Sequence, residues 1–536
     1  MRLNDMELAD KAQWEKAGVA LPQFDRKAMI AATEKAPVWV HFGAGSIFRA
    51  FPAAMMQTLL ERSLAETGIV VAEGYDGEII DRCFTPFDNL TLLVTLKADG
   101  TTEKRVVASV ASAYKMDTDL QALRDIFAKP SLQMASFTIT EKGYSLKGAD
   151  GAFLPGIAED MRAGPSDPKS YLGRIAALCY ERYARGANPL AMVSMDNCSH
   201  NGDILFAAVE AFAREWVKND KADAGFLDYV RDRAKVYFPW TMIDKITPRP
   251  DDGVLDMLAA AGLEEMQGIA TEKNTYAAPF VNAEETQYLV IEDIFPNGRP
   301  PLEKTGVLFT DRETVDKVER MKVCTCLNPL HTALAVFGCL LGYTRISEEM
   351  KNPDLVRLIE GIGYREGLPV VTDPGVISPR EFIDTVINVR LPNPFMPDAP
   401  QRIAMDTSQK VGIRFGGTIR AYMESPELSV DDLTLIPLVL AAWLRYLLGI
   451  DDEGKPFAVS PDPLYDTLAV RLSGLSLGQQ GPFRAALEPI LSDAKIFAVN
   501  LYEAGLGTRI EAYFGELLEG PGAVARTLRK YAGQQS

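Results

Sequence analysis

Two glycines, Gly43 and Gly45, directly follow a short apolar run, and their spacing suits the binding of a dinucleotide. The first glycine permits a tight turn, and the second lets the backbone approach a pyrophosphate at the start of the next helix. The third glycine of the usual fingerprint is absent, because Phe48 occupies its place. A plain strand-to-helix turn would show the same pair of glycines. The neighbouring charged residues are therefore needed to distinguish a dinucleotide site from such a turn.

Three charged residues near this turn suit a nicotinamide dinucleotide. Arg49 lies in the next helical turn and could reach a phosphate. Glu73 and Asp76 follow the second apolar run, where an acid would bind the ribose hydroxyls. An acid there would repel a 2′-phosphate, so the sequence favours NAD over NADP. The alternative for either acid is a solvated loop carboxylate.

The elements that position these residues alternate along the first half of the chain. Segments of helical spacing separate apolar runs at residues 38–42, 68–72, 105–110, 134–140 and 190–195. Strands that alternate with helices predict an α/β domain built on a largely parallel sheet.

Helical periodicity dominates the second half. It is clearest at residues 311–327, 329–343, 353–361, 378–388, 430–449, 483–492 and 508–516. Residues 310–313 read as a capping box in which the Thr310 hydroxyl accepts from the backbone and Glu313 reaches back. We therefore predict two domains, residues 1–309 and residues 310–536.

The composition excludes several classes of function. The 73 acidic and 56 basic residues give a net charge of −17, which disfavours nucleic-acid and anionic-membrane partners. A small anionic substrate is still compatible, since a few buried cations can bind it. Residues 433–450 are the most apolar stretch, but they contain Pro437 and Arg445 and are expected to form a buried helix.

Cysteine and histidine usage favours a cytoplasmic enzyme that works without a metal. Six Cys in 536 residues are too sparse for a disulfide scaffold, and residues 1–16 lack the apolar stretch of a signal peptide. Only three His are present, and Cys324 and Cys326 have no second pair with which to bind zinc. Zinc chemistry through His200 and His331 stays an alternative.

Several segments, in order along the chain, resemble motifs of one enzyme family. Residues 41–50 resemble the glycine motif of the mannitol dehydrogenase family, the polyol-specific long-chain dehydrogenases. The segment 238–248 is similar to its F-P-x-x-x-V-D-R-I-T-P signature, with Ile243 and Lys245 as departures. Further similar segments are residues 138–144, 196–202, 292–293 and 297–300. The resemblance spans nearly the whole chain.

The resemblance implies a Rossmann-type N-terminal domain that binds NAD and a mostly α-helical C-terminal domain for the substrate. Ungapped counting back from Phe87 and Asp88 places the family's acidic cofactor position at Asp76, ahead of Glu73. The implied cofactor contacts are Phe42, Gly43, Ala44, Gly45, Phe48, Arg49, Glu73, Asp76, Thr140 and Glu141.

The resemblance also assigns the chemistry. It makes Lys322 the acid/base and Asn197 and Asn328 the donors to the oxyanion. His331 would position the reacting hydroxyl or carbonyl, and Glu319 would control proton exchange with solvent. Substrate contacts are then expected from Asn197, Asp244, Lys322, His331, Arg402 and Lys410.

One departure from the family lies in the catalytic run. Lys322 is six residues from Asn328 and nine from His331, one more than the family's five and eight. On one unbroken helix the extra residue would turn Asn328 and His331 about 100° away from Lys322. Asn328-Pro329 reads as the N-cap and first residue of a new helix, so a break there would absorb the residue. The alternative role for Asn328 is that of a helix cap alone.

These observations predict an NAD-dependent oxidoreductase that interconverts D-fructuronate and D-mannonate. A tagaturonate reductase, a mannitol 2-dehydrogenase and a non-catalytic NAD(H)-binding sensor are the alternatives. The expected partner is a small sugar acid or polyol, with no nucleic acid and no membrane. Family members are often monomers, so a monomer is expected.

Overall fold

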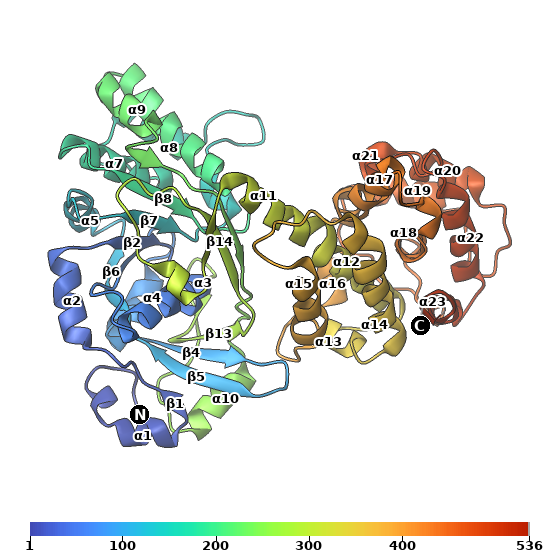
Figure 1. Cartoon of the computed structure of the whole chain (residues 1–536), viewed down its shortest axis with the longest axis horizontal. Coiled ribbons are helices and arrows are strands. Elements are labelled where there is room, and N and C mark those ends of the chain that lie inside the picture. The colour runs from blue at the N-terminus through green and yellow to red at the C-terminus, as the bar shows by residue number, and fades with distance from the viewer. Residues whose placement is uncertain (534–536) are drawn as a thin grey trace. The chain divides into compact units, whose positions relative to one another are not determined.

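The computed structural model describes residues 1–533. The chain forms two compact units, residues 1–97 with 101–316, and residues 98–100 with 317–536. In Figure 1 the first unit holds the blue to green elements, and the second holds the yellow to red helices.

The first unit is built on a six-stranded sheet in the order β6-β3-β2-β7-β8-β9, and every neighbouring pair is parallel. Counted along the chain within this sheet, the order is 3-2-1-4-5-6, which is that of the Rossmann fold. The strands are β2 (Trp39–Phe42), β3 (Ile69–Glu73), β6 (Val110–Lys115), β7 (Met134–Phe137), β8 (Leu190–Ser194) and β9 (Val236–Tyr237).

Helices cover both faces of this sheet, which explains why its strands read as continuous apolar runs. Along β2 the side chain of Trp39 enters one core, while Val40 and Phe42 enter the other. One core is completed by α2 (Arg26–Lys35), α3 (Ser46–Ala50) and α4 (Pro52–Glu61). The other is completed by α5 (Leu120–Phe127), α6 (Pro155–Ala163), α7 (Tyr171–Ala184), α8 (Asn201–Lys218) and α9 (Ala224–Arg231).

Smaller sheets flank the central one, in the orders β1-β5-β4-β13, β10-β14-β15 and β11-β12. The apolar run 105–110, which we expected to form one strand, is divided between two sheets. The run contains the end of β5 and the first residue of β6. Ser109 lies between the two strands, and its carbonyl accepts a hydrogen bond from the backbone N–H of Ile69. The bounds are β1 (Val19–Ala20), β4 (Thr91–Leu96), β5 (Thr102–Val107), β10 (Thr241–Asp244), β11 (Ile269–Ala270), β12 (Tyr276–Ala277), β13 (Phe280–Glu284), β14 (Tyr288–Glu292) and β15 (Leu308–Thr310); α1 (Lys11–Lys16) and α10 (Asp252–Ala260) complete the unit.

The second unit is helical. Its core packs α12 (Asn328–Leu340), α18 (Leu435–Tyr446) and α22 (Gly507–Leu518) together, and every residue of α18 is buried. The other helices are α13 (Ile346–Glu349), α14 (Pro353–Glu360), α15 (Pro379–Thr385), α16 (Pro400–Ile403), α17 (Gly417–Glu424), α19 (Tyr465–Leu472), α20 (Arg484–Leu491), α21 (Ala494–Phe497) and α23 (Ala523–Gly533). π-Helical turns span Lys322–Cys326, Gly361–Gly367, Val386–Arg390 and Gly412–Gly416.

One helical stretch, Arg312–Leu340, is long and apolar enough to cross a membrane by length and composition alone. Most of its apolar part is buried inside the protein's own fold, as in the core helix of a globular domain. It begins with α11 (Arg312–Met321). The expected capping box is displaced by one residue: Thr310 ends β15, and the Asp311 carboxylate accepts from the backbone N–H of Thr314.

Candidate active site

The glycine turn lies between β2 and α3, as expected. Gly43 has a φ of +104°, and a Cβ atom there would lie 2.3 Å from the carbonyl oxygen of Thr138. A side chain at this position would therefore push the turn away from the end of β7. A Cβ atom at Gly45 would meet nothing within 4 Å, so this residue faces open space.

A cavity of about 590 Å³ opens beside this turn. It lies at the carboxyl ends of β2, β3 and β7, at the point where the strand order reverses and Rossmann folds bind their dinucleotides. Its lining residues are Gly43, Gly45, Glu73, Gly74, Tyr75, Ile79, Thr138, Ile139, Thr140, Lys142, Gly143, Tyr171 and Thr275.

Of the two candidate ribose acids, Glu73 lines this cavity and Asp76 does not. Glu73 is the last residue of β3, and its carboxylate accepts from the backbone N–H of Ala44 at 2.8 Å and of Tyr75 at 2.7 Å. Asp76 is buried and accepts a 2.6 Å hydrogen bond from the hydroxyl of Thr271. Glu73, which counting from the family motif ranked second, is therefore the acid at the cavity, and Asp76 is engaged beside it.

Three other predicted cofactor residues face away from the cavity. Arg49 was expected to reach a phosphate, but its guanidinium is buried and donates to the Ala278 carbonyl at 2.6 Å. Burial lowers the pKa of Arg49 to about 10. Phe42 is part of the apolar core, and Phe48 stacks on His41 with ring centroids 4.3 Å apart.

The remaining predicted cofactor residues differ in position. Thr140 lines the cavity, Ala44 is buried in the apolar core, and Glu141 is exposed at the start of a short 3₁₀ turn outside the lining. Tyr171 also lines the cavity, and its buried hydroxyl has no hydrogen-bond partner in residues 1–533. An orphaned hydroxyl, an acid at the end of β3 and an open glycine turn together fit a bound dinucleotide.

The loop after β8 is held by a network of buried polar groups. The Asp196 carboxylate accepts from the backbone N–H groups of Ile139 and Thr140, at 2.9 and 2.8 Å, and from the Tyr144 hydroxyl at 2.6 Å. Burial raises the pKa of Asp196 in spite of these hydrogen bonds. The neighbouring Asn197, a predicted oxyanion donor, is exposed, so the network fixes the backbone that presents its amide.

A second network ties this loop to β10. The Asn201 amide donates to the Thr241 hydroxyl at 2.9 Å and to the Asp196 carbonyl at 3.0 Å. Thr241 is the first residue of β10, and the predicted substrate residue Asp244 is the last and is buried.

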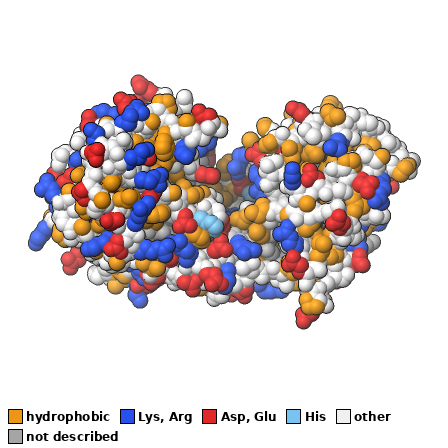
Figure 2. Space-filling model, turned by 90° about the horizontal axis from the view of Figure 1, so that it is seen from above, with side chains coloured by type: hydrophobic (Ala, Val, Ile, Leu, Met, Phe, Trp, Pro, Cys, Tyr) orange, Lys and Arg blue, Asp and Glu red, His pale blue; other side chains and the backbone are white. Residues whose placement is uncertain are grey.

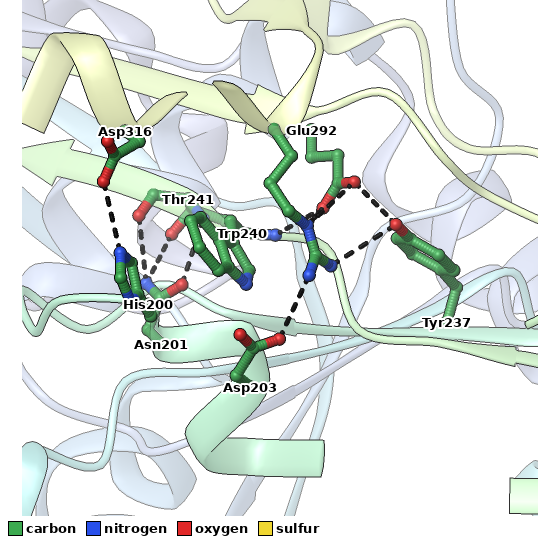
Figure 3. Close-up of polar contacts among 9 residues, drawn as sticks. His200, Asn201, Asp203, Tyr237, Trp240, Thr241, Glu292 and Asp316 are labelled. Atoms are coloured by element: carbon green, nitrogen blue, oxygen red, sulfur yellow. Dashed lines mark hydrogen bonds and ion pairs between the residues drawn. The ribbon is translucent and has the colours of Figure 1, made fainter. Parts of the chain in front are cut away.

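The beginning of α11 is anchored beside the same loop (Figure 3). His200 stacks on Trp240 with ring centroids 4.0 Å apart, and its Nε2 lies 3.2 Å from Asp316. Arg312 binds the buried Glu292 carboxylate at 3.0 Å and Asp203 at 3.1 Å. His200 thus has a packing role, and no group of three His, Cys, Asp or Glu side chains within residues 1–533 could hold a metal.

The extra residue of the catalytic run is accommodated by a π-helical turn. After α11 ends at Met321, Lys322–Cys326 forms this turn, and α12 begins at Asn328. A π turn is an α-helix widened by one residue, so it takes up the insertion, and a break follows at Leu327, whose φ of −128° is not helical. This corrects our expectation for Asn328: Leu327 is the N-cap, and Asn328 is already helical.

Two predicted proton-handling groups flank the start of this turn. Lys322 is buried, with 5% of its surface exposed. Glu319 lies one helical turn before it on α11 and is partly buried. Lys322 is thus interior, and Glu319 lies nearer to solvent.

His331 lies one turn into α12 and is surrounded by charged side chains of the second unit. Its Nε2 is 3.6 Å from the Asp398 carboxylate and has no hydrogen-bond partner within residues 1–533. Burial lowers the pKa of His331 to about 4; Asp398 opposes this, and neighbouring guanidinium groups reinforce it. The imidazole is therefore neutral near pH 7. The guanidinium groups belong to Arg390, Arg402 and Arg414.

The predicted substrate cations are each engaged locally. Arg402 pairs with Asp398, and the Lys410 ammonium donates to the Met405 carbonyl at 2.6 Å. Asp398 and Arg390, two charged neighbours of His331, were not predicted from the sequence. The i, i+4 spacing of Asp398 and Arg402 was the available signal for the first. Nothing in the local pattern singled out Arg390.

Two domain families match most of the chain. The Mannitol dehydrogenase Rossmann domain matches residues 37–304, and the Mannitol dehydrogenase C-terminal domain matches residues 314–503. The chain belongs to the mannitol dehydrogenase family.

Relatives within this family include enzymes of sugar acids and of polyols. The chain is 52% identical to a D-mannonate oxidoreductase of Thermotoga maritima over 540 aligned positions, which cover 100% of both chains. It is 30% identical to a mannitol 2-dehydrogenase of Pyrenophora tritici-repentis, over 81% of this chain and 73% of the relative.

Solved structures of mannitol dehydrogenase relatives have the same fold. The ternary complex of Pseudomonas fluorescens mannitol 2-dehydrogenase with NAD and D-mannitol superimposes with a TM-score of 0.68, at 27% identity and full coverage of both chains. A substrate-free D-sorbitol dehydrogenase gives a TM-score of 0.81 at 24% identity, over 98% of this chain and 100% of that one. The predicted family, the Rossmann-type fold with a helical second part, the oxidoreductase activity and NAD as cofactor are thereby confirmed.

Proposed function

We propose that this member of the mannitol dehydrogenase family is a D-mannonate oxidoreductase that interconverts D-fructuronate and D-mannonate. One observation carries the choice of a sugar acid: the second unit gathers Arg390, Arg402, Lys410 and Arg414 near His331. Such a concentration of cations suits a substrate that bears a carboxylate. The full-length similarity to a D-mannonate oxidoreductase supports the same substrate.

The residues of the first unit would hold the dinucleotide. Gly43 and Gly45 leave room for the pyrophosphate, and the Glu73 carboxylate would accept from the ribose hydroxyls. When bound, NAD supplies or accepts the hydride. Glu73 would repel a 2′-phosphate, which favours NAD over NADP.

The residues of the second unit would handle the proton. We assign Lys322 as the donor to the substrate oxygen during reduction and as the acceptor of the hydroxyl proton during oxidation. Its burial keeps this proton from exchanging directly with solvent, and Glu319 would carry it outward. Neutral His331 would orient the reacting oxygen by a hydrogen bond.

Two amides would stabilise the charge that develops on that oxygen. The Asn197 and Asn328 side chains are suited to donate N–H bonds to it, and such donors lower the barrier because they need no reorganisation. We assign Asp244 to the substrate hydroxyls. No metal is required in this assignment.

The setting that we propose is a monomer in the cytoplasm, acting on a free sugar acid. The net charge of −17 disfavours a polyanionic partner. On the face shown in Figure 2, acidic and basic side chains are interspersed with hydrophobic and polar groups.

The oxidation of NADH with D-fructuronate and D-tagaturonate, side by side and with EDTA present, tests this function. Faster turnover of D-fructuronate is the expected result. Faster turnover of D-tagaturonate would identify an altronate oxidoreductase. Turnover of D-fructose alone would identify a polyol dehydrogenase, and NADH binding without turnover of any of them would identify a sensor.

A further inference from the structure

Arg414 differs from the other cations around His331 in its hydrogen-bond and ion-pair partners. It lies in the π turn Gly412–Gly416, which packs against the π turn Lys322–Cys326. Its guanidinium donates to the hydroxyl of Thr332, the residue after His331 on α12. Two widened helical turns thus bring this guanidinium to the helix that carries the predicted catalytic residues.

Two of the neighbouring cations have partners within the fold. Arg402 is neutralised by the carboxylate of Asp398, and the ammonium of the partly buried Lys410 donates to the Met405 carbonyl. Arg414 is partly buried as well, and within residues 1–533 its guanidinium has one neutral acceptor, the Thr332 hydroxyl, and no carboxylate partner.

Burial and neighbouring charge both affect the pKa values of this cluster. Burial lowers the pKa of Arg414 to about 10. The positive charge of Arg414 also lowers the pKa of Lys410 and of His331, after the larger effect of burial on each. A guanidinium held beside other cations without an acid destabilises the free protein, and an anion bound there would relieve that cost.

A sugar acid provides such an anion, and a polyol does not. The planar guanidinium fork matches the two oxygens of a carboxylate, whereas a hydroxymethyl group offers one neutral oxygen. We propose that Arg414 binds the substrate carboxylate and makes the enzyme select sugar acids over polyols. This inference rests on the proposed function, because it assumes that the substrate binds beside His331.

The test compares matched substrates in the variants Arg414→Met and Arg414→Lys. We expect Arg414→Met to lower kcat/KM for D-fructuronate about 100-fold, the usual scale for removing one partner of a buried charge pair. Turnover of D-fructose, which lacks the carboxylate, should change less than about threefold. Arg414→Lys should retain part of the D-fructuronate activity, because the charge stays and the fork is lost.

Arg420→Met is the matched control, since Arg420 lies on α17 and donates to the Ala498 carbonyl. Its kcat/KM should match the unsubstituted enzyme for both substrates. Parallel losses on D-fructuronate and D-fructose in Arg414→Lys, or unchanged D-fructuronate activity in Arg414→Met, would overturn the inference. If the unsubstituted enzyme fails to reduce D-fructuronate, the proposed function fails instead. If D-fructose turnover is too slow to measure, competition by D-mannonate and D-mannitol against D-fructuronate gives the same comparison.

Discussion

The carboxylate of Glu73 accepts a 2.8 Å hydrogen bond from the backbone N–H of Ala44, so the acid that ends β3 lies against the glycine turn that ends β2. This contact sets the acid at the rim of the cavity where Rossmann folds bind a ribose. Asp76, which the resemblance ranked ahead of Glu73, instead accepts a hydrogen bond from Thr271.

The first prediction concerns cofactor choice. Glu73→Gln should weaken NADH binding about 10- to 100-fold, because the hydrogen bonds of the ribose hydroxyls to a charged acceptor are lost. NADPH binding should weaken less, or improve, as the repulsion of its 2′-phosphate disappears. Asp76→Asn is the control, since Asp76 bonds to Thr271 and is outside the cavity lining. Fluorescence titration measures both affinities, and a larger effect in Asp76→Asn would return the ribose role to that residue.

The second prediction concerns the proton. Lys322→Ala should lower kcat by about 10³-fold or more while leaving NADH affinity unchanged, because the variant keeps the Rossmann unit and loses its acid/base. Lys351→Ala, on an exposed surface pair with Glu348, is the matched control and should keep full turnover. Near-normal turnover of Lys322→Ala would remove this lysine from the mechanism.

The third prediction concerns the π turn. Deletion of Val323 should convert Lys322–Cys326 into an ordinary helical turn and restore the five- and eight-residue spacings of the family. We expect a folded enzyme with turnover within about tenfold, since the shortened turn then gives Asn328 and His331 the orientation relative to Lys322 that the family's spacing implies. Deletion of Ala335 inside α12 is the contrast, because it turns the rest of a buried helix by about 100°. Equal damage in the two deletions, by circular dichroism and turnover, would argue against the role of the π turn.

The fourth prediction concerns a buried acid that packs against α12. Glu349 is fully buried against Gly338 of α12, and neither carboxylate oxygen has a hydrogen-bond partner within residues 1–533. Burial raises its pKa to about 9. The native state therefore keeps a proton that the unfolded chain releases, and the free energy of unfolding should fall as the pH rises.

Between pH 5 and 8 this single group should contribute a decrease of about 1.4 kcal/mol per pH unit. Glu349→Gln cannot ionise, so its difference from the unsubstituted enzyme should widen in favour of the variant over that range. Urea denaturation at several pH values measures this, with the exposed Glu348→Gln as control. Parallel curves for the unsubstituted enzyme and Glu349→Gln would contradict the burial of an acid at this site.

Much of the fold can be predicted from the sequence, because helices cover both faces of the central sheet. Strands such as β2 and β8 are then unbroken apolar runs, and α12 and α18 are long segments with apolar residues at helical spacing. Helix boundaries at α14 and α22 also follow from their spacing.

The features that could not be predicted from the sequence depend on tertiary contacts. The run 105–110 gives no sign of the switch between sheets at Ser109, which is fixed by contacts with Ile69 and Ala53. The direction of Arg49 depends on a carbonyl more than two hundred residues away. A π turn changes which carbonyl each N–H meets without changing apolar spacing, so residues 322–326 read as ordinary helix.

The most direct test of the central claim is the formation of NADH from NAD by the EDTA-treated enzyme with D-mannonate, D-altronate and D-mannitol as separate substrates. The site described above predicts rapid formation with D-mannonate and a kcat/KM for D-mannitol lower by about two orders of magnitude, the scale of one buried guanidinium–carboxylate contact. A preference for D-mannitol, or activity that EDTA abolishes, would contradict a metal-free enzyme that recognises a sugar acid.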